Sequence, residues 1–211
     1  MNIICSLVSA LSLVLCLSLS ADAATVAETL EKVTVDVAQL EIGFGNYTLG
    51  KALTADQKIT AARNPIQKSL QGTYKFKDGE TFVVVSSEND TIIGLYQDYP
   101  DTTFDHLKTV IGTLMLEHGE PTTMGHDKLV YWLYDNNGKI EQDAFKFQRE
   151  NAGPGSLAAV KFSSSEPIVE TEQHADEGAE DKTPRKFSAY VMITSDPLSR
   201  LFLAANKQEE K

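Results

Sequence analysis

The middle of the chain carries a hydrophobic pattern that predicts a helix followed by a strand. Thr102 or Thr103 can cap the helix N-terminus, and Gly119 suits the left-handed conformation that ends many helices. Leu129 to Tyr134 is an unbroken apolar and aromatic run that is typical of a strand. The helix is predicted because its apolar side chains recur at steps of three or four residues, the period of one helix face. These residues are Phe104, Leu107, Ile111, Leu114, Met115 and His118.

The rest of the chain is predicted to contain more strands than helices. Helical spacing indicates helices over residues 24–42, 54–63 and 197–206, the second capped by Thr54. Alternating or apolar runs indicate strands over residues 74–77, 81–86, 91–97, 143–149, 157–163 and 187–193. Strand runs joined by short turns favour an α+β fold. We therefore expect an antiparallel sheet of about seven strands with helices packed on one face.

Residues 1–23 are predicted to be a secretory signal peptide. Ile3 to Ser20 is apolar or small, and Ala21-Asp22-Ala23 resembles a cleavage site. An uncleaved N-terminal anchor is the alternative, because the apolar run is long for a signal. The remaining chain divides into an N-terminal helix over 24–46, an α+β domain over 47–206 and a tail over 207–211.

An acidic segment interrupts the predicted domain. Glu166 to Asp181 holds seven Asp and Glu residues and neither Lys nor Arg. Few apolar groups are available there to form a core, so residues 165–186 are expected to be a mobile insertion. The flanking strands, 157–163 and 187–193, are expected to pair as a hairpin with a long loop.

Composition and charge exclude several classes of function. The formal net charge is −11 and the chain has no basic stripe, which argues against nucleic acid as a partner. Both cysteines, Cys5 and Cys16, lie in the predicted signal peptide. After cleavage, a disulfide framework and a thiolate nucleophile would both be excluded. We expect a periplasmic or secreted protein without a transmembrane domain; its oligomeric state stays open.

One group of residues has the chemistry of a metal site. His118, His126 and Asp127 lie at and after the end of the predicted central helix. Imidazole and carboxylate are zinc ligands, and a loop can bring two histidines to one ion. The alternative is a histidine at a helix end followed by a polar loop.

The aromatic strand is a candidate partner-binding surface. Alternate strand residues point to opposite faces, so Trp132 and Tyr134 share one face and Tyr131 lies on the other. An open face carrying such side chains would suit a protein partner. The alternative is that both sets of side chains belong to the core.

Catalytic patterns are absent from the sequence. It contains no Gly-x-Ser-x-Gly motif, and its clustered carboxylates lie in the predicted insertion rather than on a rigid element. The run Gly153-Pro154-Gly155 lacks the Lys and hydroxyl residue of a phosphate-binding loop. The sequence therefore predicts neither an enzyme nor a cofactor.

Two short motifs carry a resemblance to a known group of domains. HGEP at residues 118–121 follows an amphipathic helix and precedes YWLY at residues 131–134. This helix, Gly-x-Pro, Trp-x-Tyr arrangement resembles β-lactamase-inhibitor-protein-like and SmpA/OmlA-like small bacterial envelope domains. The LGKALT run at residues 49–54 is similar to the opening of such a unit. The resemblance implies two α/β units sharing one sheet, and protein–protein contact in the cell envelope without catalytic residues.

We therefore expect a non-enzymatic binding protein of the periplasm or the extracellular space, whose partner is another protein that it contacts at the sheet face or through the acidic segment. A module that binds a small ligand or a metal cation is the alternative, through His118, His126 and Asp127 or the acidic segment. An unrecognised hydrolase is the third possibility.

Overall fold

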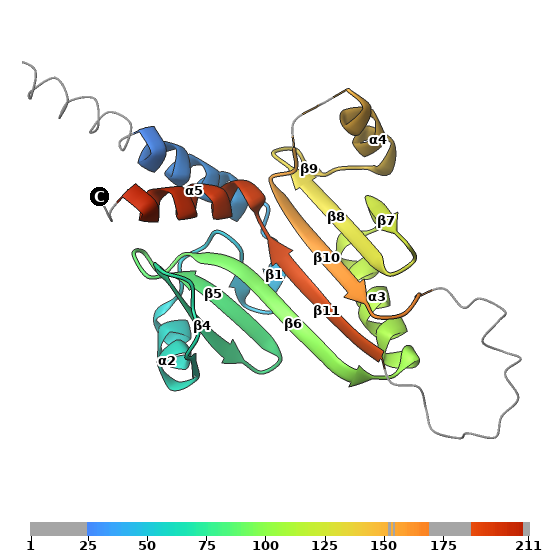
Figure 1. The fold of residues 1–211 in the computed structure, drawn as a ribbon, viewed down its shortest axis with the longest axis horizontal. Coiled ribbons are helices and arrows are strands. Elements are labelled where there is room, and N and C mark those ends of the chain that lie inside the picture. Colours follow the sequence, from blue (N-terminus) through green and yellow to red (C-terminus); the bar gives the residue numbers. More distant parts are fainter. Residues whose placement is uncertain (1–24, 152, 154, 169–186, 209–211) are drawn as a thin grey trace, which may run out of the picture.

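An antiparallel sheet spans the whole molecule (Figure 1). The computed structural model describes residues 25–151, 153, 155–168 and 187–208. Within these residues, nine strands form one sheet in the order β3-β4-β5-β6-β11-β10-β8-β7, with β9 paired to β8. The predicted α+β fold is confirmed. The predicted signal peptide and residues 169–186 of the predicted insertion lie outside the described residues.

The strands and helices follow the predicted pattern in most places. A small hairpin comes first, formed by β1 (Gly43–Phe44) and β2 (Tyr47–Thr48). The strands of the large sheet are β3 (Pro65–Ile66), β4 (Thr73–Asp78), β5 (Thr81–Ser86), β6 (Ile92–Thr102), β7 (Thr123–Gly125), β8 (Leu129–Asp135), β9 (Gly138–Lys139), β10 (Ala158–Ser164) and β11 (Phe187–Thr194). The helices cover residues 25–39, α2 (Ala55–Arg63), α3 (Phe104–His118), α4 (Gln142–Glu150) and α5 (Asp196–Gln208).

The N-terminal helix caps agree with the sequence prediction, and the glycine that ends α3 agrees in position and in the sign of φ. The Thr54 hydroxyl accepts from the Gln57 N–H, and the Gln57 side chain accepts from the Thr54 N–H, which together form a capping box. Thr103 caps α3 through the His106 N–H. Gly119 ends α3 at φ 74° and ψ −160°, so its φ is positive as predicted. Its ψ places it outside the left-handed helical region, in a conformation that is essentially restricted to glycine.

The last strand joins the two halves of the sheet. Strand β11 lies between β6 and β10 and is antiparallel to both. Its pairing with β10 confirms the predicted hairpin around the acidic segment. Pairing with β6 then connects the β4-β5-β6 meander to the group formed by β10, β8 and β7. The meander and this second group of strands, which come from separate stretches of the chain, therefore form one continuous sheet.

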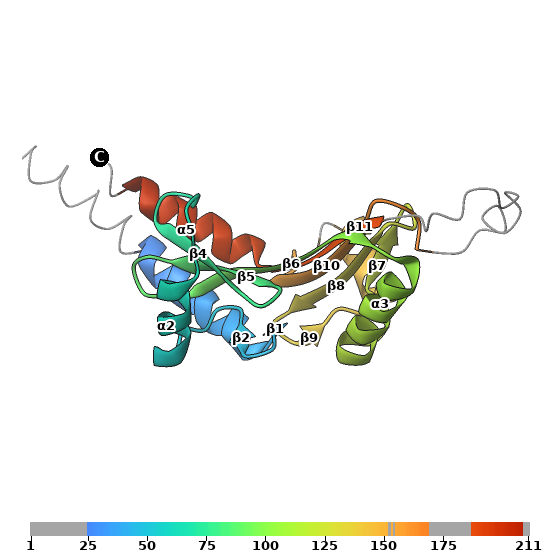
Figure 2. The ribbon, with the colours of Figure 1, turned by 90° about the horizontal axis from the view of Figure 1, so that it is seen from below.

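The two faces of the sheet differ in cover. Figure 2 shows α2, α3 and the β1–β2 hairpin below the sheet and α5 above it, next to the end of β11. Alternate strand residues point down and are buried against the elements below. One core cluster includes Phe76, Val83, Val85, Leu95, Trp132, Val160, Phe162, Val191 and Ile193 from the sheet, together with Val37, Leu49, Leu53, Leu107 and Leu114. The core therefore belongs to both halves of the sheet.

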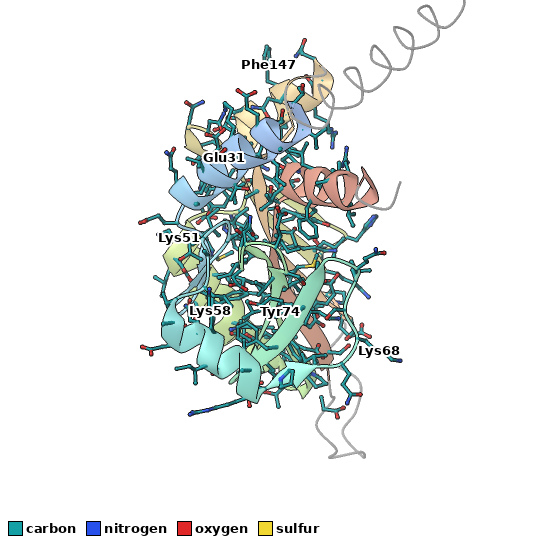
Figure 3. All side chains as sticks on the ribbon, turned by 90° about the vertical axis from the view of Figure 1, so that its left-hand side faces the viewer. Glu31, Lys51, Lys58, Lys68, Tyr74 and Phe147 are labelled. Carbon is teal, nitrogen blue, oxygen red and sulfur yellow. The ribbon has the colours of Figure 1, made fainter. Side chains whose placement is uncertain are left out.

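The strand predicted over residues 143–149 is wrong, because these residues form helix α4. Seven residues of alternating pattern suit a strand, but most of them also have good helix propensity. Side chains two positions apart lie on nearly opposite sides of a helix. Accordingly Phe145 is half-buried and Phe147 is 67% exposed. Figure 3 shows Phe147 at the top of the view, on α4, which has no buried residue.

Over the part of the chain that the structure describes, every helix is too short or too polar to cross a bilayer.

Candidate functional site

The structure divides the predicted aromatic surface between two faces. Trp132 is fully buried and Tyr134 is 8% exposed, and both lie in the core below the sheet. Tyr131 is half-buried on the upper face. The alternative interpretation therefore holds for Trp132 and Tyr134: they pack inside the protein and cannot contact a partner in this conformation. Tyr131 remains available at the surface.

Trp132 and Tyr134 connect strand β8 to the end of α3. The Trp132 Nε1–H donates to the Gly119 carbonyl oxygen at 2.8 Å. The Tyr134 hydroxyl lies 2.9 Å from His118 Nδ1 in a hydrogen bond. The His118 ring also packs on both aromatic rings, with centroid distances of 6.0 and 6.2 Å. These contacts hold the helix end against the strand.

His118 is the one buried histidine among the described residues. Its side chain is 6% exposed, and burial lowers its pKa because the charged form loses hydration. Its Nε2 lies 3.9 Å from the Glu117 carboxylate, which raises the pKa by a smaller amount. Within the described residues, Nε2 has no hydrogen-bond partner. Desolvation is the larger effect, so burial favours the neutral form of His118.

The three predicted metal ligands do not converge. His118 contacts Tyr134 at one end of β8, whereas His126 and Asp127 form the β7–β8 turn before Leu129. Five strand residues separate these ends, or about 17 Å. His126 and Asp127 are exposed and have positive φ values of 52° and 53°, as expected in a tight turn. Over the described part of the chain, no group of three or more His, Cys, Asp or Glu residues is placed to hold a metal ion.

The upper surface of the sheet carries a different set of residues, which we call the outer face. It consists of the strand positions that alternate with the buried ones. Their side chains are half-buried, except for the exposed Lys77. The outer face comprises Ile66, Lys75, Lys77, Phe82, Val84, Tyr96, Asp98, Thr123, Leu129, Tyr131, Leu133, Asp135, Ala159, Lys161, Ser163, Tyr190, Met192 and Thr194.

Six outer-face residues form a continuous row, which we call the aromatic band. The band contains Lys77, Phe82, Tyr96, Tyr190, Lys161 and Tyr131, one from each of β4, β5, β6, β11, β10 and β8. The Lys77 ammonium lies 4.9 Å from the Phe82 ring centroid. The Phe82 and Tyr96 centroids are 5.6 Å apart, and those of Tyr96 and Tyr190 are 5.7 Å apart. The Lys161 ammonium lies 5.3 Å from the Tyr190 centroid and 5.8 Å from that of Tyr131.

The register of the strands produces this row. Lys77 is directly opposite Phe82, Phe82 is opposite Tyr96, and Lys161 is opposite Tyr131. Tyr190 lies diagonally from Tyr96 and from Lys161, because Met192 is the residue directly opposite both. Diagonal neighbours on a sheet remain within reach of aromatic and long side chains. The band therefore crosses six adjacent strands.

Lys161 and Tyr190 of the band change each other's pKa. The neighbouring Tyr190 hydroxyl raises the pKa of Lys161, and Lys161 in turn lowers the pKa of Tyr190. Burial, with a smaller contribution from a hydrogen bond to Asp98, raises the pKa of Tyr96 to about 12. The raised pKa of Lys161 favours its charged ammonium form, and the raised pKa of Tyr96 favours its neutral phenol. The band can thus offer cations, hydroxyl donors and ring faces to a ligand.

Sequence reasoning identified Tyr131 alone among the six residues of the band. The signal that was available is period-two alternation, which places Phe82, Tyr96 and Tyr190 opposite the buried positions of their strands. The order of the strands was not predictable from this signal. Without that order, residues from six segments could not be assigned to one row.

Another polar cluster lies below the sheet and has a structural role. Asp90 accepts a hydrogen bond from the Tyr74 hydroxyl at 2.6 Å and pairs with the Lys58 ammonium at 2.6 Å. These contacts lower the pKa of Asp90, and Lys58 has the largest effect. Lys58 comes from α2 and Tyr74 from β4, and Figure 3 shows both on the same side of the molecule. The cluster connects α2 to the β5–β6 turn.

Comparisons with known proteins add no family to this description. Neither protein-family models, nor curated protein sequences, nor solved structures gave a match to the chain.

Proposed function

We propose that the protein is a non-enzymatic binding protein of the cell envelope or the extracellular space, and that it contacts another protein through the outer face. The aromatic band is the observation that carries this proposal. Aromatic residues and methionine are enriched at the cores of protein interfaces. The outer face has this composition, with Phe82, three tyrosines and Met192.

Two features of the sequence support the proposed location. The apolar segment before Ala21-Asp22-Ala23 has the pattern of a secretory signal. The helix, Gly-x-Pro, Trp-x-Tyr arrangement at residues 104–134 resembles envelope domains that act through protein contact.

The proposal predicts that a partner can be trapped from the outer face. The photo-reactive amino acid p-benzoylphenylalanine is placed separately at Phe82, at Tyr131 and at Phe147 in the cells that produce the protein. All three positions hold aromatic side chains, so the substitution is sterically mild. Phe147 is 67% exposed on α4 and serves as the matched control. Irradiation should give a discrete protein adduct from positions 82 and 131 and not from position 147.

Either of two results would contradict the proposal. Absence of a protein adduct from both outer-face positions would exclude protein contact there. Adducts of the same protein from all three positions would indicate a collision that is not specific to the outer face. Mass spectrometry of the adduct identifies the trapped protein and the peptide attached to each position.

A further inference from the structure

The outer face differs in charge from the protein that carries it. The whole chain has a formal net charge of −11. On the outer face, the charged side chains are three lysines, Lys75, Lys77 and Lys161, and two carboxylates, Asp98 and Asp135, so lysines outnumber carboxylates by one. Two of these lysines, Lys77 and Lys161, belong to the aromatic band. An excess of lysine over carboxylate on one face of an acidic protein is complementary to an anionic ligand and steers its approach.

The two lysines lie between rings rather than apart from them. The Lys77 ammonium is over the ring of Phe82, and the Lys161 ammonium lies near the rings of Tyr131 and Tyr190. Each cation is therefore adjacent to apolar surface. A ligand that contacts both the cations and the apolar surface would carry carboxylates that alternate with apolar groups.

We infer that the outer face binds an acidic segment of the partner protein, in which aromatic or aliphatic side chains lie between carboxylates. This inference rests on the function proposed above and names the chemistry of the partner. The partner's carboxylates pair with Lys77 and Lys161, and its apolar side chains cover the rings of the band and Met192. Ion pairs of this kind set specificity and association rate, while the buried rings supply most of the affinity.

The geometry favours a protein segment over an acidic polysaccharide. The ring planes of Phe82 and Tyr96 are tilted by 57°, and those of Tyr96 and Tyr190 by 35°, so the rings do not form one flat platform for stacked sugars. Aliphatic side chains from Val84, Leu129 and Leu133 flank the band. Such a surface buries the apolar side chains of a protein well.

Binding of a random copolymer of glutamate and tyrosine tests this inference. The labelled copolymer is titrated with the purified protein, and fluorescence anisotropy gives the Kd. The double variant Lys77→Gln/Lys161→Gln should weaken binding about tenfold, which corresponds to about 1.4 kcal/mol. Raising the salt concentration should weaken binding to the unsubstituted protein, because exposed ion pairs are screened.

Three controls isolate the contribution of the band. The double variant Lys32→Gln/Lys51→Gln removes the same charge from exposed sites outside the sheet and should leave the Kd within twofold. Lys77→Arg/Lys161→Arg keeps the charge and should also retain binding. Polyglutamate lacks the apolar groups and should bind more weakly than the copolymer. Trp132 fluorescence reports whether each variant is folded.

Four outcomes would overturn the inference. The first is that the copolymer does not bind, and the second is that its Kd is equal for the Lys77→Gln/Lys161→Gln variant and the unsubstituted protein. The third is that polygalacturonate binds more tightly than the copolymer and that its binding depends on the same lysines, which would indicate an acidic polysaccharide as the ligand. The fourth is that sedimentation shows a dimer of the unsubstituted protein that is absent in Lys77→Gln/Lys161→Gln, which would indicate a second copy of this chain as the partner.

The photo-crosslinking experiment separates this inference from the proposed function. A protein adduct whose attached peptide lacks acidic residues would reject the acidic segment while the binding function stands. Absence of an adduct from Phe82 and Tyr131 would reject the binding function itself.

Discussion

At the scale of single residues, His118 shows how burial changes the role of a side chain. The sequence made it a candidate metal ligand, and the structure places it against Trp132 and Tyr134 with its side chain 6% exposed. Its Nδ1 is occupied by the Tyr134 hydroxyl. A histidine in this position contributes to stability in a way that depends on pH.

The free energy of unfolding is expected to fall as the pH drops below about 6.5, the pKa of histidine in an unfolded chain. Burial lowers the pKa of His118 in the folded protein, so the unfolded chain binds more protons in this range. The stability is present above the unfolded pKa and is lost at up to about 1.4 kcal/mol per pH unit below it. Urea unfolding followed by Trp132 fluorescence between pH 7.5 and about 5.5 measures this slope.

Substitution of His118 tests whether this residue causes the pH dependence of the free energy of unfolding. His118→Gln should remove this part of the pH dependence, whereas His126→Asn, in the exposed β7–β8 turn, should leave it unchanged. An equal slope in His118→Gln and the unsubstituted protein would show that burial of His118 is not its cause.

At the scale of elements, α2 illustrates a helix that depends on its cap. Among its nine residues, only Gln57 and Ala61 are buried, so packing contributes little. Gln57 completes the capping box with Thr54 and also donates from Nε2 to the Asn46 carbonyl oxygen at 2.7 Å. The cap therefore fixes both the start of the helix and its position beside the β1–β2 hairpin.

Thr54→Ala is expected to destabilise the protein by about 1 kcal/mol, because the Gln57 N–H loses its side-chain acceptor. Thr54→Ser keeps the hydroxyl and should retain most of that stability. Thr109→Ala provides a control on the exposed face of α3, where the hydroxyl only donates to the Asp105 carbonyl oxygen of the same helix; alanine is a better helix former, so the change should be neutral or slightly stabilising. Denaturant unfolding compares the three variants, and equal stability of Thr54→Ala and the unsubstituted protein would contradict the role of the cap.

At the scale of the whole molecule, strand β11 makes one sheet and one core from two halves. Val83 on β5 and Trp132 on β8 are both fully buried in the same cluster, although four strand spacings, about 19 Å, separate their strands. A shared core implies a single cooperative unfolding transition.

Val83→Ala is expected to lower the free energy of unfolding by about 2 kcal/mol through the cavity that it leaves. The transition seen by the single tryptophan, Trp132, should move by the same amount as the transition seen by far-UV circular dichroism. Val35→Ala, at a position that is 49% exposed, should change the stability by less than about 0.5 kcal/mol. A Trp132 transition that stays in place while the circular dichroism transition moves would mean that the two halves unfold separately.

The sequence by itself determined most of the helices, strands, caps and turns. Thr54, Thr103 and Gly119 act where they were predicted to act, because capping and helical periodicity depend on residues a few positions apart. Residues 143–149 are the exception, since a short alternating run with good helix propensity does not distinguish the two structures.

Only the tertiary structure decided which surfaces face outward and which residues from distant parts of the chain lie together on them. The position of β11 between β6 and β10 places Tyr190 in one row with Tyr96 and Lys161, and it depends on contacts between distant parts of the chain. Burial likewise separated Trp132 and Tyr134 from Tyr131, although all three belong to one strand. Alternation shows that a strand has two sides, and the elements that pack against the sheet determine which side is open.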